Sequence, residues 1–307
     1  MQTILGSGGA IGTGLAKELL KFTKDIRLVS RNPEKVNETD QLFPADLTDK
    51  EQVMNAVKGS DIVYLTVGLP YSKKVWKETW PKIMHNTIEA CKKYNSKLVF
   101  FDNIYMYDKT RLNGMDEKTP VNPPSKKGEV RAGIRKMLLD EIESGKVKAL
   151  IARSADFYGP GIGNSILQEG AVKPLSKGKK ASWFGSLDKK HSFTYTPDAA
   201  KATALLGNAD KAYGKEWHLP TAGNPPTGRE WIEAFANEFG VKPKSQVGSK
   251  FIISVIGLFN PLMREMTEMI YQYDRDYVFD SSRFEKEFDM KPTPYSEGIK
   301  KVAESFK

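Results

Sequence analysis

The sequence is poor in cysteine and histidine and has no long apolar run. Its 307 residues include one cysteine, Cys91, and three histidines. A disulfide framework is therefore excluded, and we expect a cytoplasmic protein. No Cys, His and Asp residues recur at metal-ligand spacing, so we expect no metal. The longest apolar stretch, residues 251–259, is shorter than the roughly 20 residues that span a bilayer. It predicts a buried or interfacial helix and no membrane partner.

Acidic residues are also fewer than basic ones, which gives a formal net charge of +9. Nucleic-acid binding would explain such a balance, but the lysines are scattered and no basic motif is interleaved with aromatic residues. We therefore expect no nucleic-acid partner. The densest basic run, residues 173–190, is either a solvated loop or a means of attracting an anionic ligand.

The first half of the chain alternates short apolar segments with amphipathic ones. The pattern predicts strands at 2–5, 26–30, 43–47, 61–68, 97–107 and 148–160, and helices at 10–22, 49–59, 73–94 and 125–144. This alternation is typical of an α/β fold with a doubly wound parallel sheet that helices cover on both faces.

The alternation stops after Pro160, where segments shorten and helices dominate. We expect one domain over residues 1–160 and a smaller, mainly helical substrate domain over 161–307. A segment near 191–205 is expected to return to the first domain. In the second domain, Thr227 suits the start of a helix that runs to Phe239.

Four glycines crowd into residues 6–12, GSGGAIG. Gly6, Gly9 and Gly12 fit the spacing G-x-x-G-x-x-G, between a predicted strand and a predicted helix. In that place helix-start N–H groups face a pyrophosphate, and only glycine permits its close approach. We expect a Rossmann-type dinucleotide site that includes Gly6, Gly8, Gly9, Ala10, Ile11 and Gly12. The alternative is a purely structural turn.

The residues after the second strand select the cofactor. An NAD site usually places Asp or Glu there, whereas this chain has Ser30 and Arg31. A hydroxyl and a guanidinium bind a 2′-phosphate, so we expect NADP(H) rather than NAD. The alternative for Arg31 is an ordinary surface arginine.

Several motifs together carry a family resemblance: GSGGAIG, Asp46-Leu47, LTVG ending in Thr66, Val67 and Gly68, RSADFYGPG at 153–161, and HSFTYTPDAAKA at 191–202. With these motifs in this order, nearly the whole chain resembles the extended short-chain dehydrogenase/reductase superfamily, in its NAD-dependent epimerase/dehydratase branch. The resemblance implies that Asp46 contacts adenine. It also adds Leu47, Thr66, Val67 and Gly68 to the expected cofactor site.

The resemblance further implies a Ser/Thr–Tyr–Lys arrangement, from which this chain departs. Lys127 matches the family lysine, which binds the nicotinamide ribose, but Pro123 then stands at the tyrosine position. Asn103 stands near the serine position. The alternative for Lys127 is a solvated lysine.

Other residues could replace the missing tyrosine. Tyr105 ends a central strand and is either a substitute proton donor or a packed structural residue. The pair Tyr105 and Lys109 has the spacing Y-x-x-x-K, but a loop there would lack the one-turn helical geometry. Asp156 is either a base or acceptor in the substrate pocket or a structural residue. His191 stands where sugar-nucleotide enzymes of the branch tend to carry a diphosphate-binding arginine.

Together these features predict an NADP(H)-dependent oxidoreductase or epimerase/dehydratase-like enzyme without the usual tyrosine. Its substrate would be small and organic or sugar-like, and the protein a monomer or homodimer. The alternative is a non-catalytic NADP(H)-binding sensor, which the missing tyrosine favours.

Overall fold

The computed structural model describes residues 1–163 and 165–306 of the chain. The chain forms two compact units. Unit 1 consists of Met1–Ile104, Lys127–Arg153 and Ala199–Leu219, and unit 2 contains the other described residues. Residues 199–219 belong to unit 1, whereas residues 191–198 of the expected returning segment belong to unit 2.

This arrangement differs from the expected division into two contiguous domains at residue 160. Residues 105–126 leave unit 1 because their strand β6 (Asn113–Met115) pairs in parallel with β13 (Val278–Phe279), far along the chain. Periodicity within a short window carries no signal for such a distant pairing.

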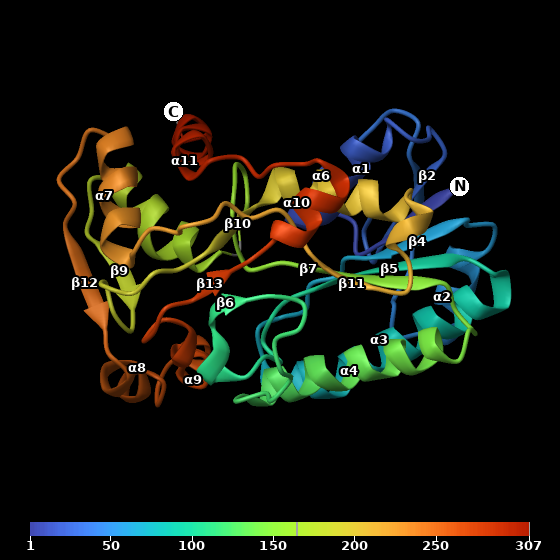
Figure 1. Ribbon diagram of the computed structural model, residues 1–307, viewed down its shortest axis with the longest axis horizontal. Coiled ribbons are helices and arrows are strands. Elements are labelled where there is room, and N and C mark those ends of the chain that lie inside the picture. The colour runs from blue at the N-terminus through green and yellow to red at the C-terminus, as the bar shows by residue number, and fades with distance from the viewer. Residues whose placement is uncertain (164, 307) are drawn as a thin grey trace. The chain divides into compact units, whose positions relative to one another are not determined.

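Unit 1 is built on a seven-stranded parallel sheet (Figure 1). The order of its strands is β11 (Glu216–His218), β7 (Ala149–Arg153), β5 (Lys97–Asp102), β4 (Ile62–Leu65), β1 (Gln2–Leu5), β2 (Ile26–Ser30) and β3 (Gln41–Pro44). Strands β1, β4 and β7 are buried at every position, as expected of a parallel sheet covered on both faces. The α/β, doubly wound architecture predicted from the alternation is confirmed.

Helices cover both faces of this sheet (Figure 1). Helices α1 (Ala10–Leu19) and α6 (Thr196–Gly207) lie on one face, and α2 (Lys50–Val57), α3 (Lys73–Tyr94) and α4 (Lys126–Glu143) on the other. A short 3₁₀ turn, η3 (Asp210–Ala212), precedes β11. Helix α1 packs closely on α6, since a Cβ added at Gly14 would lie 2.9 Å from the Cβ of Ala200.

Unit 2 contains three pairs of parallel strands, β6 with β13, β8 with β10 and β9 with β12. Its remaining elements are η1 (Lys109–Arg111), β8 (Asp156–Tyr158), η2 (Gln168–Val172), α5 (Lys173–Ser176), β9 (Ala181–Phe184), β10 (Phe193–Tyr195), α7 (Gly228–Glu238), β12 (Ser245–Gly248), α8 (Lys250–Ile256), α9 (Pro261–Thr267), η4 (Ile270–Gln272), α10 (Ser282–Phe288) and α11 (Tyr295–Glu304). An aromatic core that includes Tyr158, Trp183 and Trp231 packs β8, β9, β10, α7 and α11 together. The predicted cap is confirmed, because the Thr227 hydroxyl accepts the Glu230 N–H at the start of α7.

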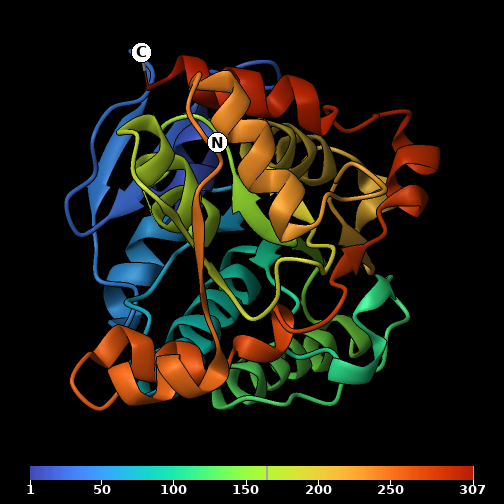
Figure 2. The same ribbon diagram turned by 90° about the vertical axis from the view of Figure 1, so that its left-hand side faces the viewer.

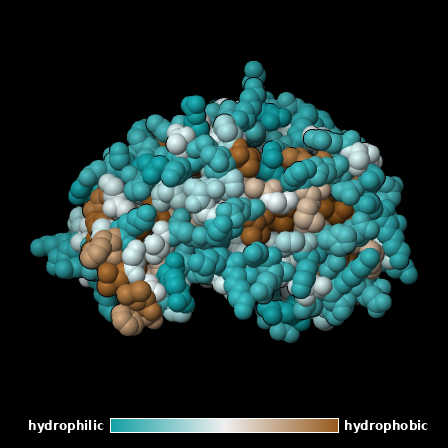
Figure 3. Space-filling view, turned by 90° about the horizontal axis from the view of Figure 1, so that it is seen from below, coloured by the Kyte–Doolittle hydropathy of each residue, from teal (hydrophilic) through white to brown (hydrophobic). Residues whose placement is uncertain are grey.

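The apolar stretch 251–259 differs from a buried helix. Figure 2 shows α8 and α9 side by side, in orange at the lower left. On α8 only Ile253 is buried, whereas Phe251 is 76% exposed. In Figure 3 apolar residues gather on the side where Figure 1 places these helices. Within residues 1–163 and 165–306, no helix is both long and apolar enough to cross a membrane.

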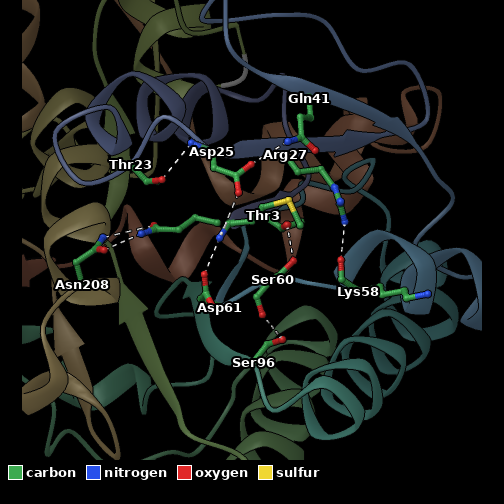
Figure 4. A network of polar contacts seen from close by, with 12 residues as sticks. Thr3, Thr23, Asp25, Arg27, Gln41, Lys58, Ser60, Asp61, Ser96 and Asn208 are labelled. Carbon is green, nitrogen blue, oxygen red and sulfur yellow. Dashed lines mark hydrogen bonds and ion pairs between the residues drawn. The ribbon is translucent and has the colours of Figure 1, made fainter.

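Hydrogen bonds link residues at the end of the sheet where its strands begin (Figure 4). The Thr3 and Ser60 hydroxyls lie 2.6 Å apart, and the Ser96 hydroxyl donates to the Ser60 carbonyl at 2.6 Å. The Arg27 guanidinium donates to the Lys58 carbonyl at 3.0 Å. The opposite edge holds the point between β1 and β4 where strand order reverses, and ligands of such sheets collect there.

Candidate functional site

The loop that follows β1 makes a turn that requires glycine. Gly6 has φ +98°, and a Cβ there would lie 2.4 Å from the N and Cα atoms of Val67. A Cβ at Gly12 would lie 2.8 Å from the Gly6 carbonyl oxygen. These contacts are with backbone, which cannot move aside cheaply. The turn therefore brings together the loops after β1 and β4.

Gly9 is under a different constraint. It caps α1 with φ −80° and ψ 166°, a conformation open to any residue, and its cap position makes no side-chain hydrogen bond. A Cβ at Gly9 would find its nearest atom, the Gly6 carbonyl oxygen, only at 4.0 Å. The fold itself does not require glycine at this position. The space above Gly9 and the N–H groups that open α1 suit an anion.

The neighbours of Gly9 differ in exposure. Gly8, with φ +92°, has nothing within 4 Å of an added Cβ and is exposed, as is Ala10. Ile11 is buried, at 6% exposure. The expected role of Ile11 in the cofactor site is therefore limited to its backbone.

The ends of β2 and β3 bring Ser30, Arg31 and Asp46 into one region. The Ser30 carbonyl accepts the Ala45 N–H at 2.9 Å, and the Arg31 side chain is exposed. The Asp46 carboxylate accepts the N–H and the hydroxyl of Thr48, each at 2.8 Å. These two hydrogen bonds, and then the charge of Arg31, hold the pKa of Asp46 below its usual value. No carboxylate follows β2 directly.

The loop after β4 completes this edge of the sheet. The Thr66 N–H donates to the Leu5 carbonyl at 2.9 Å, and its hydroxyl donates to the Gly6 carbonyl at 3.3 Å. Gly68 has open space where a side chain would stand. Leu47, by contrast, is buried, and its carbonyl accepts the Asn86 amide at 3.1 Å.

Lys127 is completely buried in the first turn of α4. Its Nζ lies 4.5 Å from the ring centroid of Tyr71, which belongs to the segment between β4 and α3. The alternative of a solvated lysine is wrong. This cation–π contact with the ring face stabilises the buried ammonium. Asn103 follows β5 and is half-buried.

Tyr105 lies in a turn directly after β5 and is half-buried. Lys109 begins the 3₁₀ turn η1, so the two residues share no helix, as expected. Pro123 precedes the start of α4 at Lys126. The position one turn before Lys127 therefore carries no hydroxyl.

Asp156 is part of an aromatic cluster in unit 2. Its carboxylate accepts the Tyr273 hydroxyl at 2.7 Å and lies 3.0 Å from His191 Nε2. The His191 ring is stacked between Tyr273, at 4.5 Å, and Tyr277, at 4.3 Å, and is 1% exposed. These contacts support the structural alternative for Asp156. They also leave His191 without access to a diphosphate.

Sequence reasoning missed a buried network of charges between α4 and the sheet. Asp102 lies 2.8 Å from Arg131 and 3.3 Å from Arg153, and Arg153 lies 2.6 Å from Glu216. Although burial raises the pKa of Glu216, the charges of Arg153 and Arg135 hold it below its usual value. Asp102 immediately precedes Asn103, so the network fixes the end of β5. The signal of it in the sequence is the four-residue spacing of Arg131 and Arg135, which puts both on one face of α4.

We expect Asp102→Asn to destabilise the fold by about 3–5 kcal/mol, since it leaves two buried guanidiniums with one carboxylate fewer. Urea denaturation measures the change. The matched control is Asp140→Asn, which breaks an exposed pair with Lys136 on α4 and should cost under about 1 kcal/mol. An equal loss of unfolding free energy in the two variants would show that the buried network stabilises the fold no more than an exposed ion pair does.

Solved structures of similar fold cover the whole chain. UDP-glucose 4-epimerase of Thermus thermophilus, solved with NAD, matches with TM-score 0.81 and 19% identity over 100% of this chain and 99% of its own. UDP-glucuronic acid 4-epimerase of Bacillus cereus, solved with UDP-glucuronic acid and NAD, matches with TM-score 0.81 and 15% identity over the same shares. A dTDP-glucose 4,6-dehydratase of Streptomyces venezuelae, with NAD bound, matches with TM-score 0.78 and 14% identity over 100% and 97%.

Comparison by sequence identifies a single family. A comparison with curated protein sequences finds no match. The model of one family, described as the NAD dependent epimerase/dehydratase family, matches residues 3–218, which include the glycine loop, the loop after β4, Asn103 and Lys127. This chain therefore belongs to the NAD dependent epimerase/dehydratase family.

Proposed function

We propose that this protein is an NADP(H)-dependent oxidoreductase with an atypical active site, acting on a small organic or sugar-like substrate. The observation that carries the proposal is the open space above Gly9, at the start of α1. Beside it, Ser30 ends β2 and Arg31 follows, where NAD sites usually carry a carboxylate.

The residues present fit a dinucleotide. The N–H groups at Gly9 to Gly12 would hold the pyrophosphate, and Asp46 would hold the adenosine end. Lys127 would bind the ribose beside the nicotinamide. When bound, the cofactor supplies a hydride donor or acceptor, and the chain supplies orientation and a proton.

The choice between the two cofactors depends on the end of β2. The named structural neighbours were solved with NAD, yet this chain has Ser30 and Arg31. Thr48 donates two hydrogen bonds to the Asp46 carboxylate, and the charge of Arg31 is the smallest of the causes that shift the pKa of Asp46. The Arg31 guanidinium, which is exposed, can then bind a 2′-phosphate through two hydrogen bonds.

We expect NADPH to bind at least tenfold more tightly than NADH, and Arg31→Ala to remove this difference. Tenfold corresponds to about 1.4 kcal/mol, within reach of one charge-assisted contact. Isothermal titration with both cofactors measures it. Arg111→Ala, at an exposed arginine of unit 2, is the matched control. Equal affinities in the unmodified protein would contradict the preference for NADP(H).

The proposed chemistry needs a proton donor, and the chain offers Tyr105. A phenol has an ordinary pKa near 10, so it needs a cation nearby to work at neutral pH. Lys127 is the candidate cation, and the Asn103 amide can orient a substrate oxygen. We assign Tyr105 the transfer of the proton.

The proposed substrate carries no nucleotide diphosphate. His191 stands where the family resemblance implies a diphosphate-binding arginine, and it is enclosed by Tyr273 and Tyr277. UDP-glucose should therefore neither raise the melting temperature nor promote NADPH oxidation. A screen of carbonyl compounds and free sugars for NADPH oxidation should identify the substrate. Turnover of UDP-glucose would contradict this assignment.

A sensor is the second candidate function, because Pro123 stands at the position of the family tyrosine. The screen also separates the two functions. Tight NADPH binding with no turnover of any compound in a broad screen would favour the sensor.

A further inference from the structure

Unit 2 carries a strongly exposed apolar surface on the α8–α9 hairpin, which we define as residues 250–267. Its exposed apolar side chains, with their exposed fractions, are Phe251 76%, Ile252 46%, Val255 46%, Ile256 45%, Leu258 72%, Phe259 89% and Leu262 51%. Large apolar residues gathered in this way are rare on the surface of a soluble protein and mark an interaction site. Figure 3 shows a group of apolar residues at this end.

The hairpin is a defined structure, since capping hydrogen bonds begin both of its helices. The Ser249 hydroxyl accepts the Ile252 N–H at 3.3 Å, and the Asn260 amide oxygen accepts the Met263 N–H at 3.2 Å. A Cβ at Gly257 would lie 3.0 Å from the N and Cα of Arg264, so glycine there allows α8 to end against α9. The side of the hairpin that faces solvent consists mainly of apolar side chains.

The turn between the helices carries two of the three most exposed apolar side chains of the hairpin. Phe259 and Leu258 protrude more than nearly all the apolar side chains of α8 and α9. They follow Gly257, where the chain leaves α8. A projecting apolar tip suits insertion into the boundary between lipid headgroups and acyl chains.

The nearest charged residues before and after the tip, Lys250 and Arg264, are both basic. Residues 239–264 contain no Asp or Glu, and their charged residues are Lys242, Lys244, Lys250 and Arg264, all exposed. The first carboxylate after them, Glu265 on α9, is half-buried. The whole chain has a net charge of +9. A second copy of this chain would bring like charges together around the same tip, whereas anionic headgroups complement them.

We propose that the α8–α9 hairpin docks on the surface of an anionic phospholipid bilayer, with Leu258 and Phe259 entering the interfacial layer. The docking is peripheral, since only the tip of the hairpin enters the interfacial layer. It departs from the expectation of no membrane partner, and it is independent of the proposed oxidoreductase activity.

Sedimentation of the full chain with vesicles tests the proposal. Vesicles of phosphatidylcholine containing phosphatidylserine should carry down most of the protein at low salt, and pure phosphatidylcholine vesicles little of it. The double variant L258S/F259S should lower the partition coefficient at least tenfold. Phe22→Ser, at a phenylalanine of unit 1 that is 44% exposed, is the matched control and should bind normally. Unchanged melting temperatures establish that the variants are folded.

A further double variant separates lipid from other occupants. Lys250→Gln with Arg264→Gln should weaken binding to anionic vesicles and reduce its salt dependence. Equal sedimentation of wild type and L258S/F259S, or equal binding to neutral and anionic vesicles, would overturn the proposal. So would light scattering that shows a dimer of the wild type and a monomer of L258S/F259S, since the occupant would then be a second copy.

Discussion

Gly9→Val should abolish cofactor binding while the fold is retained. The backbone angles of Gly9 are open to valine, and a Cβ there meets no atom closer than 4.0 Å. The loss of a glycine at this cap costs about 1 kcal/mol. The branched side chain, however, would occupy the space that we assign to the pyrophosphate. NADPH should stabilise the wild type against heat and leave the variant unchanged.

Gly6→Ala provides the contrast for this experiment. Its Cβ would lie 2.4 Å from the backbone of Val67, at a φ of +98°, so the damage is to the fold. The backbone strain alone costs about 1–3 kcal/mol. The melting temperature without cofactor should fall clearly more for Gly6→Ala than for Gly9→Val. Persistent stabilisation of Gly9→Val by NADPH would place the cofactor elsewhere.

Tyr105→Phe should cut turnover at least a hundredfold and barely change NADPH affinity. General acid–base assistance is typically worth about 10²–10⁴ in rate, and the substitution removes only the hydroxyl. Steady-state kinetics on the substrate found by the screen, together with titration of NADPH, measure both quantities. Tyr94→Phe, at a tyrosine of α3, is the control and should keep full activity.

A fully active Tyr105→Phe protein would rule out this tyrosine as the donor. An ordered water would then be the next candidate, since the Asp156 carboxylate is engaged by Tyr273 and His191. Activity that falls together with NADPH affinity would instead show a structural role for Tyr105.

The sequence was sufficient for the parts of the fold that depend on local patterns. Helix 73–94 and strands 2–5 and 26–30 have the predicted bounds, because periodicity and caps act within a few residues. The glycine loop was predicted for the same reason, since its spacing reflects one turn between a strand and a helix. The fold requires glycine at position 6 but not at position 9. Only the structure shows this difference.

Features that depend on distant partners could not be predicted. Asp156 meets His191 and Tyr273 from different segments of unit 2. Arg131 looks like a surface arginine until Asp102 is placed 2.8 Å away. The stretch 251–259 has the composition of a core helix, yet only Ile253 and Gly257 within it are buried. Composition indicates that such side chains avoid water, but not what covers them.

Hydrogen exchange measured with and without NADPH tests the central claim most directly. If the cofactor lies over the glycine loop, saturating NADPH should slow exchange of the amides in residues 6–12 and 66–68, together with those at Ser30 and Arg31. The amino edge of the sheet, around Ser60 and Ser96, should be unaffected. Protection confined to other segments, or no protection at concentrations that saturate binding, would contradict the account.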